Sequence, residues 1–158
     1  MREYPKYKKV LFCTDFSENA DDAFEYAYGV AKRDEGLLYI LHVVPDNPNQ
    51  ALVDGFMKTE DKEKMQRAIR EDLDRNYRER YASKMAKGLS FEVVTKSGRE
   101  AEEILGFAKK EQVDLIVMGT HGRTGMEHVF FGSVAEKVIR HSPIPVLVIP
   151  SGEKRRSS

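Results

Sequence analysis

The 158-residue chain has no tryptophan, one cysteine and no excess of charge of either sign. The single thiol, Cys13, excludes an intramolecular disulfide and a metal centre built from thiolates of this chain. Lysine plus arginine and aspartate plus glutamate number 26 each. This balance argues against a nucleic-acid binder or a protein of anionic membrane surfaces, because both carry a surplus of positive charge.

Long apolar runs are also lacking. None approaches the roughly 20 residues that span a bilayer, and residues 1–9 have no apolar stretch of the kind found in secretory signals. We therefore expect a soluble cytoplasmic protein without a membrane partner. A chain of this length that is 41% hydrophobic can form one core, since domains commonly have about 100–200 residues. We predict a single domain over residues 1–158, with residues 152–158 as a flexible tail.

Five apolar segments are predicted as β-strands, because each is too short for a helix of its own. They are residues 10–14, 37–44, 89–95, 114–118 and 145–149. The last two are apolar on both faces, which is typical of parallel strands covered by helices on both sides. Helical patterns fill the gaps, with Ser17 predicted to cap the first helix and Pro143 to follow the end of the last. The alternation predicts an α/β fold: a doubly wound, five-stranded parallel sheet of order 3-2-1-4-5 with helices on both faces.

A strongly charged segment, residues 58–87, interrupts this pattern between the second and third strands. Its apolar residues recur every fourth position: Met65, Ile69, Leu73, Tyr77, Tyr81 and Met85. Five such steps rotate the apolar stripe by about 200° around a helix, so one flat sheet cannot contact all six residues. We predict a long helix whose two ends contact different surfaces, the far end being available to a protein partner. The charges are most simply a solvated face.

The predicted sheet order places the expected ligand site at the carboxyl ends of two strands, the first and the fourth. In such sheets a ligand binds beyond the carboxyl ends of the strands, where the chain order reverses. Here that point follows Cys13 and Met118. After Met118 comes Gly119-x2-Gly122-x9-Gly132-Ser133, in which Gly132-Ser133 precedes a helix whose first amides suit a phosphate. The alternative is that the glycines only form a tight turn and Ser133 only caps the helix. The position of the whole spacing between a strand and a helix favours phosphate binding.

This spacing resembles the G-x2-G-x9-G-[ST] signature of the universal stress protein family, in its nucleotide-binding branch. The resemblance extends over nearly the whole chain and includes residues 9–17, 41–44, 114–119 and 142–148. It implies a Rossmann-like, ATP-binding stress-response protein that acts as a nucleotide-dependent sensor or regulator, with Mg²⁺ able to accompany the phosphates. It also implies a homodimer through the C-terminal strand, whose exposed apolar edge would otherwise favour aggregation.

The resemblance also implies roles for individual residues. Thr14 and Asp15 are expected to contact the nucleoside and Val43 the adenine. The ribose and phosphate path is expected along Met118, Gly119, His121 and Gly122, and the terminal phosphates at Gly132, Ser133 and Val134. Two alternatives remain open: Asp15 as the cap of a turn, and His121 as a solvated loop residue. Cys13 stands where the family often has proline. A buried filler is favoured there over a redox-sensitive thiol lining the pocket.

Several catalytic motifs are missing from the sequence. There is no Walker lysine motif, no G-x-G-x-x-G fingerprint after the first strand, no H-E-x-x-H and no serine nucleophile elbow. No catalytic residue is therefore assigned. Two other functions stay open at this point. One is a slow ATP hydrolase that uses the same pocket, and the other is an interaction module that binds no nucleotide.

Overall fold

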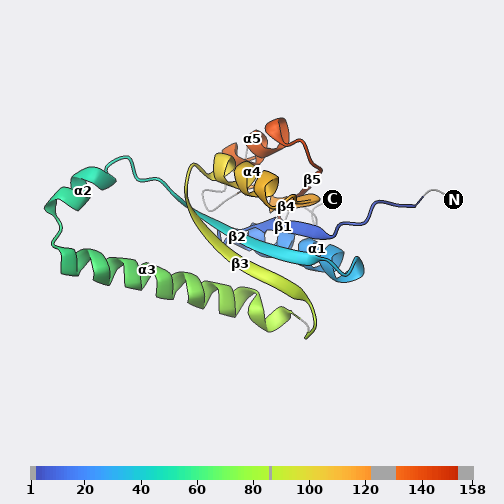
Figure 1. The fold of residues 1–158 in the computed structure, drawn as a ribbon, viewed down its shortest axis with the longest axis horizontal. Coiled ribbons are helices and arrows are strands. Elements are labelled where there is room, and N and C mark those ends of the chain that lie inside the picture. Colours follow the sequence, from blue (N-terminus) through green and yellow to red (C-terminus); the bar gives the residue numbers. More distant parts are fainter. Residues whose placement is uncertain (1–2, 86, 122–130, 153–158) are drawn as a thin grey trace.

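Strands and helices alternate along the chain in the computed structural model, which describes residues 3–85, 87–121 and 131–152 (Figure 1). The strands are β1 (Lys9–Cys13), β2 (Leu37–Pro45), β3 (Ser90–Gly98), β4 (Leu115–Gly119) and β5 (Val146–Ile149). The helices are α1 (Glu18–Arg33), α2 (Gln50–Phe56), α3 (Thr59–Arg80), a 3-10 turn (Ala82–Lys84), α4 (Glu100–Lys110) and α5 (Ser133–His141).

The five strands form one parallel sheet in the order β3-β2-β1-β4-β5, which confirms the predicted fold class and strand order. The predicted strand ends lie within one residue of the observed ones except at β3, which continues to Gly98. That extension has no apolar pattern, because Lys96 and Ser97 are polar. It forms because the backbone of β2 offers partners as far as Pro45, which is paired with Gly98.

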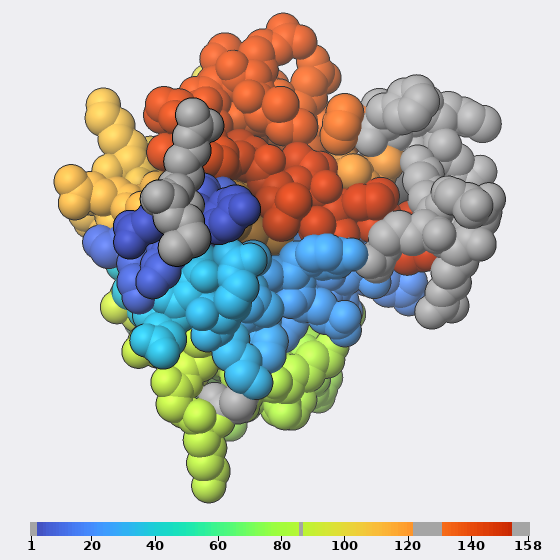
Figure 2. Space-filling model, turned by 90° about the vertical axis from the view of Figure 1, so that its right-hand side faces the viewer, coloured from blue at the N-terminus to red at the C-terminus, as the bar shows by residue number. Residues whose placement is uncertain are grey.

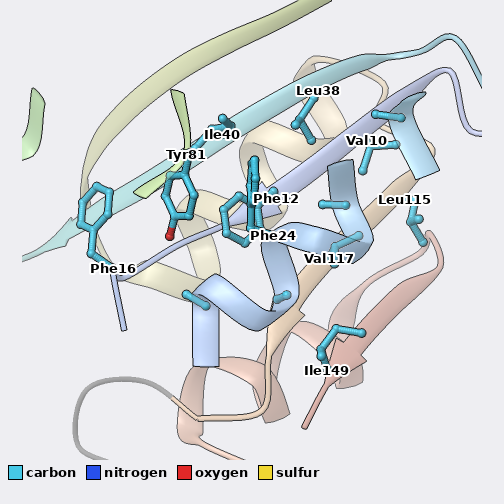
Figure 3. Packing of buried hydrophobic residues seen from close by; sticks show 14 residues of the cluster. Val10, Phe12, Phe16, Phe24, Leu38, Ile40, Tyr81, Leu115, Val117 and Ile149 are labelled. Carbon is cyan, nitrogen blue, oxygen red and sulfur yellow. The ribbon is translucent and has the colours of Figure 1, made fainter. Parts of the chain in front are cut away.

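Two apolar layers cover the sheet. On one face, α1 packs against Val10, Phe12 and Leu38; on the other, α4 and α5 pack against Leu11 and Leu41. Figure 3 shows the first layer, where Phe12 and Phe24 lie beside the ring of Tyr81. Because both faces of β1 and β4 are buried, ligands can reach these strands only at their ends.

The charged segment contains the predicted long helix. α3 spans 22 residues, about 33 Å at 1.5 Å per residue. Its last turns, with Leu73 and Tyr77, pack on the α1 layer, as does Tyr81 just beyond its end, whereas Met65 and Ile69 are exposed. One end of the helix therefore contacts the α1 layer, and the second surface predicted for the far end stays a prediction. The short helix α2, which projects from the body of the molecule in Figure 1, was not predicted.

Local sequence signals explain the helix ends. The hydroxyl of Ser17 accepts a hydrogen bond from the amide of Ala20 (3.2 Å), so the predicted cap of α1 is confirmed. α5 ends at His141, just before Ser142 and Pro143, as expected. Within the described residues, no helix is both long and apolar enough to cross a membrane.

Both ends of the chain are tied to the body of the domain. Figure 2 shows the N-terminal segment (dark blue) seated against the end of α1 and the start of β2 (cyan). There Asp34 accepts a hydrogen bond from the amide of Tyr7, and Asp114 accepts from the amides of Lys8 and Lys9. At the other end the amide of Gly152 donates to Asp22 (2.7 Å). The rest of the predicted tail, residues 153–158, lies outside the described residues.

Candidate functional site

The loop after β1 is shaped by short side chains that bond to their own backbone. Phe16 has a φ of +61°, an unusual conformation for a residue with a side chain. It is stabilised because Thr14 Oγ1 accepts from the amide of Phe16 (2.9 Å) and Asp15 Oδ1 accepts from the amide of Ser17 (3.0 Å). One oxygen of Asp15 therefore forms the turn that the alternative interpretation expected, while the half-buried residue also lines the pocket described below.

Thr14 links this loop to two other elements. Its hydroxyl lies 2.6 Å from the hydroxyl of Tyr81, and its carbonyl oxygen lies 2.8 Å from Nδ1 of His42. A carbonyl oxygen only accepts, so Nδ1 of His42 carries the proton in this bond. Thr14 is buried, and its side chain is already used within the protein. Its amide also donates to the carbonyl of Leu41 (2.9 Å), so the backbone of Thr14 too is bonded within the protein.

At the end of β4, Gly119 lacks a side chain for a reason that the sequence did not reveal. A Cβ there would lie 2.7 Å from Oδ1 of Asn19, which is closer than real Cβ contacts. The space beside Gly119 is thus filled by Asn19, whereas the sequence suggested an approach for phosphates. Gly119 nevertheless lines the pocket.

Asn19 itself is a buried residue that the sequence reading missed. Its Oδ1 accepts from the amide of His121 (2.9 Å) and the hydroxyl of Thr120 (3.2 Å), and its Nδ2 donates to the carbonyl of Ile149 (3.0 Å). It joins α1 to the ends of β4 and β5 and holds the start of the glycine-rich loop. A usable signal existed: Asn19 lies four residues before Ala23, on the inward face of the first helix.

The N-terminus of α5 faces the same region. Gly132 is its N-cap residue, and among the described residues no side chain caps the helix, so Ser133 is the first helical residue and not the cap. The amide of Gly132 donates to the carbonyl of Thr120 (2.6 Å) and is already used. The next amides, of Ser133 and Val134, belong to the first turn, where backbone donors have no partner within the helix and the helix dipole is positive.

These elements enclose a pocket of about 600 Å³, a size in the range of small-molecule sites. Nine of the predicted residues line it: Thr14, Asp15, Val43, Met118, Gly119, His121, Gly132, Ser133 and Val134. The tenth, Gly122, lies outside the described residues. The structure thus brings together residues from the ends of β1, β2 and β4 and from the start of α5.

Other lining residues were not predicted. His42 comes from β2, Phe16 from the loop after β1, and Glu100 and Ile104 from α4. Three more residues, Ile69, Asp72 and Leu73, come from α3. No lysine or arginine appears among the described lining residues. Across residues 3–85, 87–121 and 131–152, no three histidine, cysteine, aspartate or glutamate side chains are grouped to hold a metal ion.

Burial and nearby charge raise the pKa values of two side chains at this site, those of Glu100 and Cys13. Partial burial, followed by the nearby charge of Asp15, raises the pKa of the Glu100 carboxyl above its usual value. Burial also raises the pKa of the Cys13 thiol to about 12. Cys13 packs in the α4–α5 layer and also borders the pocket. It is therefore a buried filler, as favoured from the sequence, and its thiol stays protonated at neutral pH.

The chain was compared with known proteins. Residues 6–150 match the model of the universal stress protein family. Universal stress protein MJ0531 of Methanocaldococcus jannaschii is 33% identical, with 94% of this chain and 85% of the relative covered. Universal stress protein MJ0577 of the same organism is 32% identical, with 96% and 98% covered.

Solved structures agree with these matches. The structure of MJ0577 has a TM-score of 0.74 at 30% identity, covering 92% of this chain and 97% of its own. Two other solved structures are complexes with nucleotides: a universal stress protein with cAMP (TM-score 0.59, 23% identity) and one from Archaeoglobus fulgidus with dAMP (0.55, 22%). Each covers 92% of this chain; the match extends over 98% of the cAMP complex's chain and 99% of the dAMP complex's chain. At that identity they establish a shared fold.

Proposed function

Because the chain belongs to the universal stress protein family, we propose that its pocket binds an adenine nucleotide, ATP, and that the protein acts as a nucleotide-dependent sensor or regulator in the stress response. One observation supports this above the others: residues from four separate segments, selected by the G-x2-G-x9-G-[ST] pattern and its associated positions, line one pocket of nucleotide size. The fold also accommodates cAMP and dAMP in the two solved complexes.

The proposed orientation follows from the chemistry of the pocket's two ends. The triphosphate lies at the start of α5, where the amides of Ser133 and Val134 and the hydroxyl of Ser133 are the donors. Mg²⁺ enters with the phosphates as Mg–ATP, since this ion commonly keeps several waters and needs only one or two protein ligands. The adenosine extends toward the ends of β1 and β2, where Val43 gives an apolar surface and Asp15 an acceptor for ribose hydroxyls or the base edge.

A thermal denaturation experiment tests this proposal. Mg–ATP at about 100 times its Kd should stabilise the protein by about 2.7 kcal/mol, which corresponds to a rise in Tm of roughly 5–10 °C for a domain of this size. AMP should give a smaller rise, because it lacks the terminal phosphates that α5 is proposed to hold.

The variant Gly132→Val should abolish the rise. The backbone at Gly132 has φ −69° and ψ 164°, which any residue adopts, so the apo Tm should change little. Gly106→Val is the matched control, because Gly106 lies in α4, an added Cβ there meets nothing within 4 Å, and it does not line the pocket. A rise that persists in Gly132→Val would contradict the phosphate assignment.

The same proteins separate the two other candidate functions. A slow ATP hydrolase would release phosphate at a rate above contaminant levels, and this release would disappear in Gly132→Val. An interaction module without nucleotide would show no rise in Tm with any adenine nucleotide.

A further inference from the structure

The charged helix α3 forms one wall of the pocket. Ile69, Asp72 and Leu73 line it, and their spacing of three and four residues places them on one side of the helix. Neither the glycine-rich signature nor the strand ends include this segment. Its contribution to the site is therefore a property of the α2–α3 insertion between β2 and β3.

The position of this wall is fixed from the far end of the helix. Tyr81, just beyond α3, is fully buried, with its ring 4.7 Å from that of Phe24 and 5.3 Å from that of Phe12, centre to centre (Figure 3). Its hydroxyl bonds to Thr14, and the neighbouring Arg80 forms an ion pair with Asp21. Ile69 lies twelve residues earlier, about 18 Å along the helix axis. The packing of Tyr81 thus fixes the position of α3, and with it the position of Ile69 in the pocket wall.

α3 and the start of α5 lie at opposite ends of the site. α3 packs in the α1 layer, with Tyr77 beside Phe91 of β3 (ring centres 6.3 Å apart), so it covers the half of the sheet formed by β2 and β3. α5 packs in the other layer and leads into β5, at the opposite edge of the sheet. Figure 1 shows the two helices on opposite sides of the sheet. A nucleotide whose phosphates lie at α5 therefore has its base directed toward α3.

The side chains at this end suit a flat apolar ring. Ile69 and Leu73 contribute from α3, and the lining also includes Val43 at the end of β2 and Ile104 of α4. Ile69 is 44% exposed in the free protein, so covering it with a ligand removes apolar surface from water. Its neighbour Asp72, which also lines the pocket, forms an exposed ion pair with Arg75 (2.6 Å).

We propose that α3 is the wall that covers the base of the bound nucleotide, so that Ile69 and Leu73 contribute affinity for the base and none for the phosphates. This inference rests on the proposed function. It assigns to the charged helix, whose last turns also pack on the α1 layer, a direct part in recognising the ligand.

The test compares Ile69→Ser with Met65→Ser. Met65 lies one turn earlier on the same stripe and is similarly exposed (37%), but it does not line the pocket. The Kd for Mg–ATP, measured by calorimetry, should rise about tenfold in Ile69→Ser, the expected size of a lost apolar contact. It should stay at the wild-type value in Met65→Ser. Inorganic tripolyphosphate, which has no base and competes with ATP for the phosphate site, should bind with the same Ki in all three proteins.

The possible failures are distinguishable. If wild-type protein binds Mg–ATP and Ile69→Ser binds it equally well, the role of α3 is overturned and the proposed function stands. If Ile69→Ser weakens ATP and tripolyphosphate alike, the side chain does not act on the base, and the inference is again overturned. If the wild-type protein binds no Mg–ATP, the proposed function fails, and the inference fails with it. Thermal melts without nucleotide check that all three proteins fold.

Discussion

Cys13 shows how burial determines the chemistry of a single residue. It is in the last position of β1, packed against the α4–α5 layer, and desolvation raises the pKa of its thiol to about 12. The thiolate is the reactive form, and at pH 8 only about one thiol in ten thousand would be ionised at that pKa. The residue borders the pocket without being suited to redox chemistry.

We expect iodoacetamide at pH 8 to modify native protein very slowly and urea-unfolded protein rapidly, because the unfolded thiol has its ordinary pKa near 8.5. Mass spectrometry of the quenched reaction measures both rates. Because folding raises the pKa of Cys13, we also predict a loss of stability at alkaline pH. Above about pH 9 the thiol ionises in the unfolded chain but not in the folded one, so the free energy of unfolding falls. A native alkylation rate equal to the unfolded rate would contradict the burial of Cys13.

Individual residues also show the limit of sequence reading. The glycine-rich signature correctly selected Gly119 and Gly132 as pocket residues. It did not reveal that Gly119 makes room for Asn19, or that the amide of Gly132 is used by Thr120. These contacts join residues about 100 and 12 positions apart along the chain, and no local pattern reports them.

At the scale of elements, the N-terminal segment is tied to the body by carboxylates. Asp34 accepts from the guanidinium of Arg33 (2.7 and 2.9 Å) and from the amide of Tyr7 (2.8 Å). These bonds, that of Arg33 first, hold the pKa of the Asp34 carboxyl well below its usual range. A lowered pKa contributes stability that is present above the unfolded pKa of about 4 and is lost as the pH falls below it.

Urea unfolding at pH 7, 4 and 3 measures this contribution. Asp34→Asn should be less stable than wild type at pH 7, and the difference should shrink toward pH 3, because the carboxyl of the unfolded chain takes up a proton at about pH 4 while the folded carboxyl, with its lowered pKa, stays ionised. Asp61→Asn, in the exposed first turn of α3, is the control and should follow the wild-type pH dependence. A constant difference between Asp34→Asn and wild type at all three pH values would show that ionisation of Asp34 does not matter.

The elements differ in how well the sequence predicted them. Short apolar runs located all five strands; β1 and β4 are buried between the two layers, whereas Phe91 and Val93 leave β3 largely exposed. The four-residue spacing that starts at Met65 correctly predicted a long helix, but α3 ends at Arg80, so Tyr81 lies just beyond it. The short helix α2 was missed because its apolar residues Leu52 and Phe56 are exposed (64% and 89%) and form no inward face. The pocket wall on α3 was missed because it depends on the anchoring of Tyr81 far from Ile69.

At the scale of the whole molecule, we propose a homodimer through β5. This strand is at one edge of the sheet, and its residues Val146, Leu147 and Val148 are only half-buried in the single chain. Pairing with a second copy would cover this edge. Light scattering of purified protein should give a mass of about twice 18.1 kDa. A mass of 18.1 kDa at micromolar concentration would contradict the dimer and leave the nucleotide proposal intact.

The binding of a nucleotide at the junction of β1, β4 and α5 is the central claim, and a crystal structure grown in saturating Mg–ATP tests it most directly. We predict the triphosphate beside the amides of Ser133 and Val134 and the adenine near Val43, enclosed on the α3 side by Ile69. A structure in which this pocket is filled by the protein's own side chains, or in which ATP is bound elsewhere, would contradict the account.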